Sequence, residues 1–394
     1  MPVSPPIRTI TLGIAEPHPL TAPIIEHAKT ILQHARVRYS EAGYEVQSVR
    51  LSTQPIFTNL AGWSVSAILA YAKELQSFLD TAGLQYCSLG PAQVTNPGFP
   101  LDRLDLIVDI LARSRAFSTT VQLATLEHGL RQDAAMPTAR IIQQLAREIP
   151  SGNGNFRFAM LACVAPGCPF FPAAYHAGPG SLSIGLQGAS IIRETLLGHE
   201  AEMSIGLEMR QVTQWLCDAL NERAAPIVAL GQDLAQEHNL LFGGIDLSPA
   251  PMGEDSIVPA LELCAGGPLG IPGTLASVAA VTAALRSTTL PTCGYCGLML
   301  PVLEDAMLGQ RWEEDYVNVH QLLFYLSVCG TGLDTIPLAG SHAVGEIAHL
   351  LLDVATLALR LQKQLSARLF PVMGRQIGER TTFTSPYLTN TRIK

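Results

Sequence analysis

Two acidic residues stand inside apolar runs of this chain, where a carboxylate needs a partner. Asp246 lies in "GGIDLSP" and Asp334 in "GTGLDTIP", and in both a proline follows within three residues. An isolated ionised carboxylate is costly to bury, so each acid must be hydrogen-bonded, paired with a cation or bound to a metal. We take both as candidate site residues; capping of a turn or pairing with an arginine is the alternative.

Two further acids, Glu254 and Asp255, follow the turn that Asp246 begins. Asp255 or Ser256 at the N-cap of a helix would be a purely structural explanation. If the chain instead brings Asp246, Glu254, Asp255 and Asp334 together, their oxygens suit a hard divalent cation, Ca²⁺ or Mg²⁺. We therefore expect a metal site formed by these four acids.

A histidine that could take part in catalysis, His176, lies in "FFPAAYHAGPG". Gly178 and Gly180 allow the backbone to approach a ligand closely, and the imidazole of His176 is suited to acid and base catalysis. The alternative is a histidine that only makes structural hydrogen bonds. We assign catalytic roles to His176 and Asp246.

Other familiar chemistry is not indicated by the sequence. It contains neither G-x-x-x-x-G-K-[ST] nor a G-x-G-x-x-G turn between a strand and a helix, so no nucleotide cofactor is expected. It also lacks a G-x-S-x-G elbow for a serine hydrolase. Cys293 and Cys296 form a C-x-x-C pair without a second pair nearby, so most of the 8 cysteines should be buried and structural. A redox role would require these two thiols to be exposed with a lowered pKa.

Short β-rich runs alternate with segments of helical period, which is typical of an α/β fold with a mostly parallel sheet, open or closed into a barrel. Strands are predicted at 9–14, 44–52, 85–90, 117–124, 156–164, 181–188, 240–248, 297–302, 332–338 and 368–372. Helices are predicted at 21–42, 64–82, 136–148, 199–238, 272–286, 315–329 and 341–366. In such folds ligands favour the carboxyl ends of strands.

The composition of the chain disfavours several classes of binding partner. The 394 residues include 25 Lys and Arg against 33 Asp and Glu, and the net charge of -8 disfavours nucleic acid and anionic lipid. Apolar runs such as "VGEIAHLLLDVATLAL" are interrupted by ionisable side chains, so no membrane span is expected, and the first residues do not read as a secretory signal. We expect a cytoplasmic protein with a small-molecule substrate; a homo-oligomer is compatible with the sequence.

Several motifs resemble, in order, those of a large bacterial and archaeal family of unknown function, UPF0210 or DUF711. The matching segments are "RTITLGI" (8–14), "PFFPAAYHAGPG" (169–180), "FGGIDLSPAP" (242–251), "EDSIVPALE" (254–262), "LPVLED" (300–305), "GTGLDTIPL" (330–338) and "LFPVMGRQIGERTTF" (369–383).

The resemblance implies a single α/β barrel domain over residues 1–394, of about ten strands, related to the barrel of glycyl radical enzymes such as pyruvate formate-lyase. His176, Asp246, Asp255 and Asp334 coincide with polar positions of the family motifs. The radical machinery is not expected, because the ending "ERTTFTSPYLTNTRIK" lacks the R-V-x-G-Y type of glycine loop.

Together these features predict a metal-assisted enzyme, a lyase, isomerase or hydrolase, acting on a small polar carbonyl or carboxylate compound at the barrel mouth. The alternative is a sensor of amino acids or carboxylates that uses the same pocket without catalysis.

Overall fold

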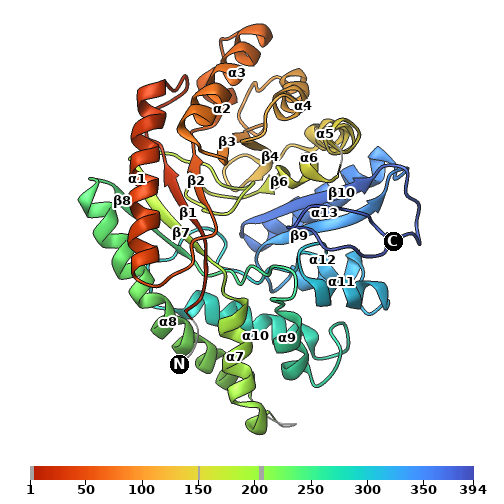
Figure 1. Ribbon diagram of the computed structural model, residues 1–394. Coiled ribbons are helices and arrows are strands. Elements are labelled where there is room, and N and C mark those ends of the chain that lie inside the picture. The colour runs from red at the N-terminus through yellow and green to blue at the C-terminus, as the bar shows by residue number, and fades with distance from the viewer. Residues whose placement is uncertain (1–3, 150, 204–207) are drawn as a thin grey trace.

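A computed structural model describes residues 4–149, 151–203 and 208–394. Strands and helices alternate along the chain, as the sequence predicts for an α/β protein (Figure 1). The strands are β1 (Ile7–Gly13), β2 (Val49–Ser52), β3 (Cys87–Ala92), β4 (Phe117–Thr125), β5 (Gly129–Leu130), β6 (Phe158–Ala162), β7 (Ser181–Leu186), β8 (Leu241–Asp246), β9 (Gly332–Ala339) and β10 (Leu365–Val372). The helices are α1 (Ala22–Glu41), α2 (Ile56–Asn59), α3 (Val65–Ala82), α4 (Leu106–Ala112), α5 (Ala135–Glu148), α6 (Asn153–Phe156), α7 (Ala189–Gly198), α8 (Met209–Glu237), α9 (Val258–Ala265), α10 (Thr274–Ser287), α11 (Ala306–Glu313), α12 (Val319–Tyr325) and α13 (Val344–Leu361).

All the described strands belong to one sheet. Its order is β8-β7-β1-β2-β3-β4-β6-β10-β9, and the short β5 pairs with β4. The strands β1, β2, β3, β4 and β6 run parallel to one another, and the pairs β7/β8 and β9/β10 are also parallel. The antiparallel pairs β1/β7 and β6/β10 join these groups, so the sheet consists of two sets of strands with opposite directions.

Helices lie around the outside of the curved sheet, and the strands lie toward the centre of the molecule (Figure 1). Local signals explain where single helices begin and end. In α3 the Ser64 hydroxyl accepts a hydrogen bond from the Ala67 N–H at 3.3 Å, and Gly83 ends the helix in the left-handed region. The largest buried apolar cluster extends from Ile7 to Leu369 and draws on both sets of strands.

The two edge strands, β8 and β9, are both hydrogen-bonded to one irregular segment, residues 291–302. The Ile245 N–H of β8 donates to Pro291 O at 2.9 Å, and the Val302 N–H donates to Asp334 O of β9 at 3.1 Å. One segment thereby contacts both edges of the sheet, which is what closure into a barrel requires. Complete closure, the relation to pyruvate formate-lyase and the single-domain assignment stay predictions.

Most elements lie where the sequence places them. Exceptions are the predicted strand 297–302, which makes only an isolated bridge, and the predicted helix 199–238, of which the structure shows α8 only from Met209. The helices α4, α7, α9 and α11 lie outside every predicted helix, and the predicted strand 44–52 is shorter, as β2. Residues 204–207 of that prediction lie outside the described residues. Over the described part of the chain, no helix is both long and apolar enough to cross a membrane.

Candidate functional site

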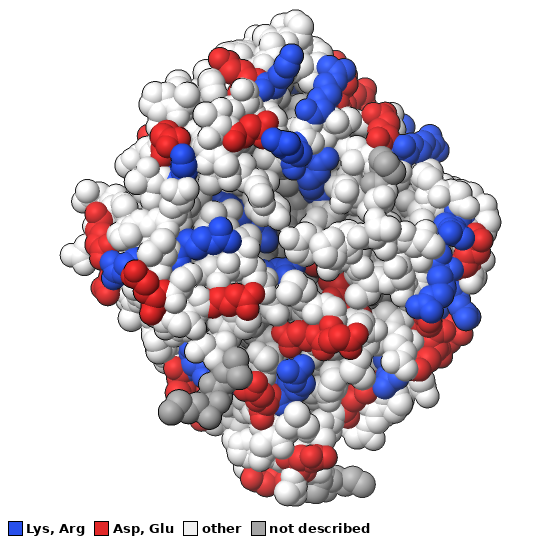
Figure 2. All heavy atoms as spheres, in the orientation of Figure 1, with Lys and Arg blue, Asp and Glu red and all other residues white. Residues whose placement is uncertain are grey.

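A cavity of about 420 Å³ opens among the strands. Figure 2 shows this face of the molecule hollowed near its centre, with basic side chains at the hollow. The charged residues of its lining are Arg8, Arg50, Arg115, Arg157, Glu304, Asp334 and Arg368, and many of the others are aromatic. The cavity thus combines several guanidinium groups with few carboxylates.

Early residues of the strands hold these side chains. Arg8 is the second residue of β1 and Arg50 the second of β2, while Asp334 and Arg368 are the third and fourth residues of β9 and β10. Tyr86 directly precedes β3. The cavity therefore lies beside the amino-terminal ends of β1, β2 and β3 and near the middle of β9 and β10, which run in the opposite direction. The site was expected at the carboxyl ends of the strands.

Four charged side chains form a buried cluster on one side of the cavity. Arg368 binds Asp334 through Nε and Nη2, at 2.5 and 2.9 Å, and its Nη2 also contacts Glu304 Oε1 at 2.5 Å. Arg8 Nη2 lies 3.5 Å from Glu304 Oε2. Burial alone would lower the pKa of Arg368, but Asp334 and Glu304 raise it above its ordinary value. Two cations and two anions balance here, so the cluster is close to neutral and firmly held.

The guanidinium of Arg50 is placed differently. It lies 5.0 Å from the ring centre of Phe171 and 5.4 Å from that of Tyr86, and its Nε donates to Ser48 Oγ at 3.0 Å. Within the described residues it forms no ion pair. Burial and the nearby Arg8 lower the pKa of Arg50 to about 9, so the group still carries its charge at neutral pH. A cation of this kind is a binding group for an anion.

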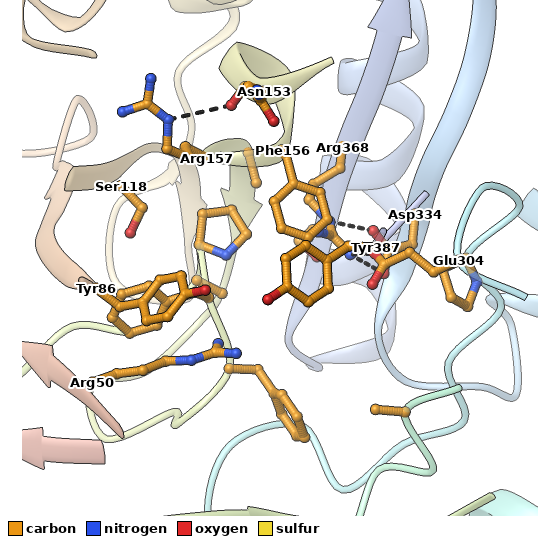
Figure 3. Close-up of a pocket in the computed structure, with 18 of the residues that line it drawn as sticks. Arg50, Tyr86, Ser118, Asn153, Phe156, Arg157, Glu304, Asp334, Arg368 and Tyr387 are labelled. Atoms are coloured by element: carbon orange, nitrogen blue, oxygen red, sulfur yellow. Dashed lines mark hydrogen bonds and ion pairs between the residues drawn. The ribbon is translucent and has the colours of Figure 1, made fainter. Parts of the chain in front are cut away.

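Hydroxyl groups accompany Arg50 in the cavity. Ser118 Oγ is buried without a hydrogen-bond partner among the described residues, and Tyr295 Oη lies near Ser366 without a hydrogen bond of normal length. In Figure 3 the hydroxyls of Tyr86 and Tyr387 point toward each other. Burial raises the pKa of Tyr86, with the Tyr387 hydroxyl adding to the shift, so Tyr86 remains a hydrogen-bond donor at neutral pH.

The two remaining arginines of the lining have structural partners. Arg157 donates to the carbonyls of Leu111, Ser114 and Phe117 at 2.8 to 3.2 Å, which satisfies the end of α4. Arg115 is exposed and pairs with Asp80 at 2.9 Å. Arg50 is therefore the guanidinium of the lining that offers uncommitted N–H groups toward the cavity.

Asp246, expected to bind a metal or substrate, is fully buried away from the cavity lining. Its carboxylate accepts hydrogen bonds from Ser248 N, Ser248 Oγ, Tyr295 N and Cys296 N, at 2.9, 2.6, 2.8 and 3.1 Å. Burial raises the pKa of Asp246, and these hydrogen bonds oppose that effect. Asp246 thus ties the end of β8 to the loop 293–297.

His176, the other expected catalytic residue, is also buried outside the cavity lining. Its Nε2 lies 2.9 Å from Pro179 O, and its ring packs against Gly13. The backbone N–H of His176 donates to Thr53 O. Burial lowers the pKa of His176, so the imidazole is neutral at pH 7. In this position the histidine holds the loop 176–180 against β1 and β2.

The four acids predicted as metal ligands are separated in their contacts. Asp255 accepts from Gln187 Nε2 at 2.9 Å and lies 3.3 Å from Arg193, while Glu254 is exposed. Of the four, only Asp334 lines the cavity. The described residues contain no group of three or more His, Cys, Asp and Glu side chains arranged to hold a metal ion. The metal assignment therefore stays a prediction, with no support from these positions.

The C-x-x-C pair does not have the properties of a redox pair. Burial raises the pKa of Cys293 well above its ordinary value, with Asp246 adding to the shift, and burial raises that of Cys296 to about 12. Each of the 8 cysteines is free, and Cys87, Cys168, Cys217, Cys296 and Cys329 are buried.

The residues that dominate the cavity are not among those predicted from the sequence: Arg50, Arg368, Glu304, Tyr86 and Tyr387. A signal for the arginines was available. Only 15% of the chain is charged, yet the strands of "IRTI", "SVRLS" and "ARLF" each carry one arginine among apolar residues. A cation inside a buried strand needs a partner from the protein or from a ligand.

Comparison with known proteins agrees with the resemblance seen in the motifs. A UPF0210 protein of Halothermothrix orenii is 26% identical over 407 residues, covering 96% of this chain and 88% of the relative. UPF0210 proteins of a Thermoanaerobacter species and of Methanocorpusculum labreanum are also 26% identical, with the same coverage of both chains. Residues 4–385 match the family described as "Uncharacterised ACR (DUF711)". The chain therefore belongs to the DUF711 family.

Proposed function

We propose that this protein is an enzyme that binds a small organic acid in the cavity and moves a proton on it. The observation that carries the proposal is the Arg50 guanidinium, which is half-buried, charged and without an ion pair among the described residues. An uncompensated buried cation is unfavourable in the empty protein. An acid group of a ligand would supply the missing charge and accept its free N–H groups.

The groups around Arg50 favour proton transfer beside the acid or carbonyl group. On one side, Arg50, Tyr86 and Ser118 are donors that stabilise negative charge on a ligand oxygen. On the other side lie the carboxylates of Glu304 and Asp334 (Figure 3). A carboxylate there takes a proton from the carbon next to the carbonyl; the electron pair of the broken C–H bond forms a C=C bond, and the π pair of the C=O bond moves onto the carbonyl oxygen. Isomerase and lyase reactions both begin with this step.

A sensor without catalysis is the second candidate, and one observation favours it. Both carboxylates are already bound to Arg368, at distances of 2.5 to 2.9 Å, so oxygens that a base would use are occupied by the protein itself. Binding alone would then be the function of the cavity.

A divalent cation stays a prediction. Glu304 and Asp334 are the acids that a cation in the cavity would contact, and it would compete for them with Arg368. Melting curves in chelator and in excess Mg²⁺ or Ca²⁺ test this point. The cytoplasmic location and a homo-oligomeric state likewise stay predictions.

The binding step is tested by thermal shift with a panel of monocarboxylic, dicarboxylic, 2-oxo and 2-hydroxy acids. A ligand of the folded state raises the melting temperature by mass action. We compare wild type with Arg50→Met and with Arg115→Ala, a control that removes an exposed arginine of the same lining. Stabilisation by an acid should persist in Arg115→Ala and disappear in Arg50→Met. Equal stabilisation of all three proteins would contradict the assignment of Arg50.

The Arg50→Met protein also carries a second expectation. Because burial makes the charge of Arg50 unfavourable, the neutral variant without ligand should melt at the same temperature as wild type or higher. Loss of binding with retained stability separates a lost contact from a failure to fold.

Catalysis is separated from sensing by exchange of ligand protons in D₂O, followed by proton NMR on the acids that bind. An enzyme of the proposed kind replaces the hydrogen beside the carbonyl with deuterium, and Glu304→Gln or Asp334→Asn should slow this by about 100-fold or more. Binding without exchange in wild type would establish the sensor instead.

A further inference from the structure

Aromatic rings form two opposite walls of the cavity. On one side Tyr86 and Phe171 lie against Arg50. On the other, the ring of Phe156 lies 5.3 Å from the guanidinium carbon of Arg368 and is stacked on Tyr387, with ring centres 6.1 Å apart and planes 19° apart. Figure 3 shows the rings of Tyr86 on one side and of Phe156 and Tyr387 on the other side of the space into which Arg50 points. A ligand in this space contacts ring surfaces over most of its length.

The lining has free donors for one acid group, those of Arg50, although Arg157 also forms no ion pair among the described residues. Arg8 and Arg368 are balanced by Glu304 and Asp334, and Arg115 is balanced by Asp80. The donors of Arg157 are committed to backbone carbonyls. A second acid group on the ligand would therefore meet either an apolar wall or the two carboxylates, and both contacts are unfavourable.

We propose that the ligand is a monocarboxylic acid with a flat, unsaturated or aromatic body, bound by Arg50 at the acid group and by the rings at the body. This inference rests on the proposed function, because it assumes that Arg50 binds the acid. Flat apolar groups are favoured between aromatic side chains, which bury much area and prefer stacked or edge contacts. Ser118 Oγ, buried without a partner in the described structure, suits one further polar atom such as a 2-oxo or 2-hydroxy oxygen.

Tyr387 is the residue to which we assign the selection of the body. It comes from the C-terminal segment, and its side chain, 43% exposed, stands where the cavity meets solvent. The segment is held in place on either side of it. Asn390 Oδ1 accepts from Phe383 N at 2.7 Å, and Thr389 N donates to Leu303 O at 2.6 Å. The position of this ring is therefore built into the fold.

Titration calorimetry with four probes tests the proposal: phenylpyruvate, pyruvate, 2-oxoglutarate and inorganic phosphate. Phenylpyruvate should bind wild type at least about tenfold more tightly than each of the other three. Tyr387→Ala should lose most of that preference, while Tyr387→Phe, which keeps the ring, should retain it. Tyr316→Ala is the matched control, since Tyr316 is similarly exposed but does not line the cavity.

The outcomes distinguish the two proposals. If 2-oxoglutarate or phosphate binds as tightly as phenylpyruvate and Arg50→Met abolishes that binding, the flat monoacid is wrong and the anion site stands. If Tyr387→Ala leaves the preference intact, Tyr387 is not the selecting residue and this part of the inference is overturned. If no acid binds in an Arg50-dependent manner, the proposed function fails, and the ligand class fails with it.

Discussion

Asp246 illustrates how a buried carboxylate is satisfied by the protein itself. Its Oδ1 accepts three hydrogen bonds, from Ser248 N, Ser248 Oγ and Cys296 N, and its Oδ2 accepts one from Tyr295 N. The Ser248 hydroxyl in turn accepts from Gly297 N at 3.0 Å. The acceptor capacity is used to fix the loop 293–297, which carries Tyr295 to the cavity.

This arrangement predicts the effect of Asp246→Asn. The amide oxygen can replace Oδ1, but the amide nitrogen then faces the Tyr295 N–H, so a donor meets a donor. We expect a loss of about 1–3 kcal/mol in the free energy of unfolding, equal in chelator and in excess Ca²⁺ or Mg²⁺. Urea melts of wild type, Asp246→Asn and the exposed control Asp353→Asn measure it. A variant that is more stable in chelator and no longer responds to the metal would instead support the metal site.

At this scale the sequence indicates which acids need a partner but not which partner they find. Asp334 was expected to contact a ligand or metal, with an arginine as the alternative, and the structure pairs it with Arg368, 34 residues away. Asp246 likewise has the turn contacts of its alternative explanation. An arginine inside a strand, as in "SVRLS", can be noticed in the sequence, but that Arg50 has no ion pair is known only from its surroundings in the fold.

The positions of strands and helices were more predictable from the sequence than the contacts of single side chains. The runs 117–124, 181–188, 240–248 and 332–338 all match observed strands to within two residues at either end, because β-branched and apolar residues fill buried strands. Boundaries were harder: the predicted strand 44–52 is only Val49–Ser52 in β2. Residues 297–302 read as a strand by composition, but they follow left-handed backbone at Gly294 and Cys296 and form only an isolated bridge at Pro301.

A substitution at Gly294 tests whether the segment 291–302 fixes the shape of the cavity. Gly294 has a φ of +66°, and a Cβ there would lie 2.2 Å from Asp246 Oδ2. Gly294→Ala therefore combines backbone strain with a clash inside the loop. Gly178, with a φ of +86° and no atom within 4 Å of its Cβ position, supplies a control that has the strain alone.

We expect Gly178→Ala to lower the free energy of unfolding by about 1–2 kcal/mol, and Gly294→Ala by clearly more. Because Tyr295 and Met299 line the cavity, Gly294→Ala should also weaken any acid that wild type binds, whereas Gly178→Ala should not. Denaturant melts and titration of the same ligand provide both readouts. Equal effects of the two substitutions would show that the loop accommodates the methyl group and does not fix the cavity.

Few residues of the whole molecule are charged, and the buried ionisable groups have the largest effect on how stability depends on pH. The chain carries 25 basic and 33 acidic residues, and most ion pairs in the structure are on the surface. Surface pairs contribute little to stability, so the pH dependence of folding falls on the buried groups. Two of them have opposite effects in acid. Burial lowers the pKa of His18 to about 4, and burial raises the pKa of Asp305 to about 6.

His18 allows a test of the direction in which the stability of the protein changes with pH. Its ring nitrogens lie 2.7 Å from Tyr71 Oη and 2.8 Å from Thr53 Oγ1, in a buried site that disfavours the charged imidazolium. The unfolded chain binds a proton at this side chain below pH 6.5, and the folded chain only near pH 4, so stability falls as the pH decreases through this window. The difference corresponds to about 3 kcal/mol. Asp305 acts in the other direction, because its folded form binds a proton more readily than its unfolded form, and stability rises as the pH falls below about 6.

His18→Gln should lower stability at pH 7 by its lost contacts but remove only the pH dependence of stability that comes from His18. The gap between wild type and variant should therefore narrow from pH 6.5 to about 4, with the Asp305 contribution cancelling in the difference. A gap that stays constant across urea melts at these pH values would show that His18 does not titrate as its burial requires.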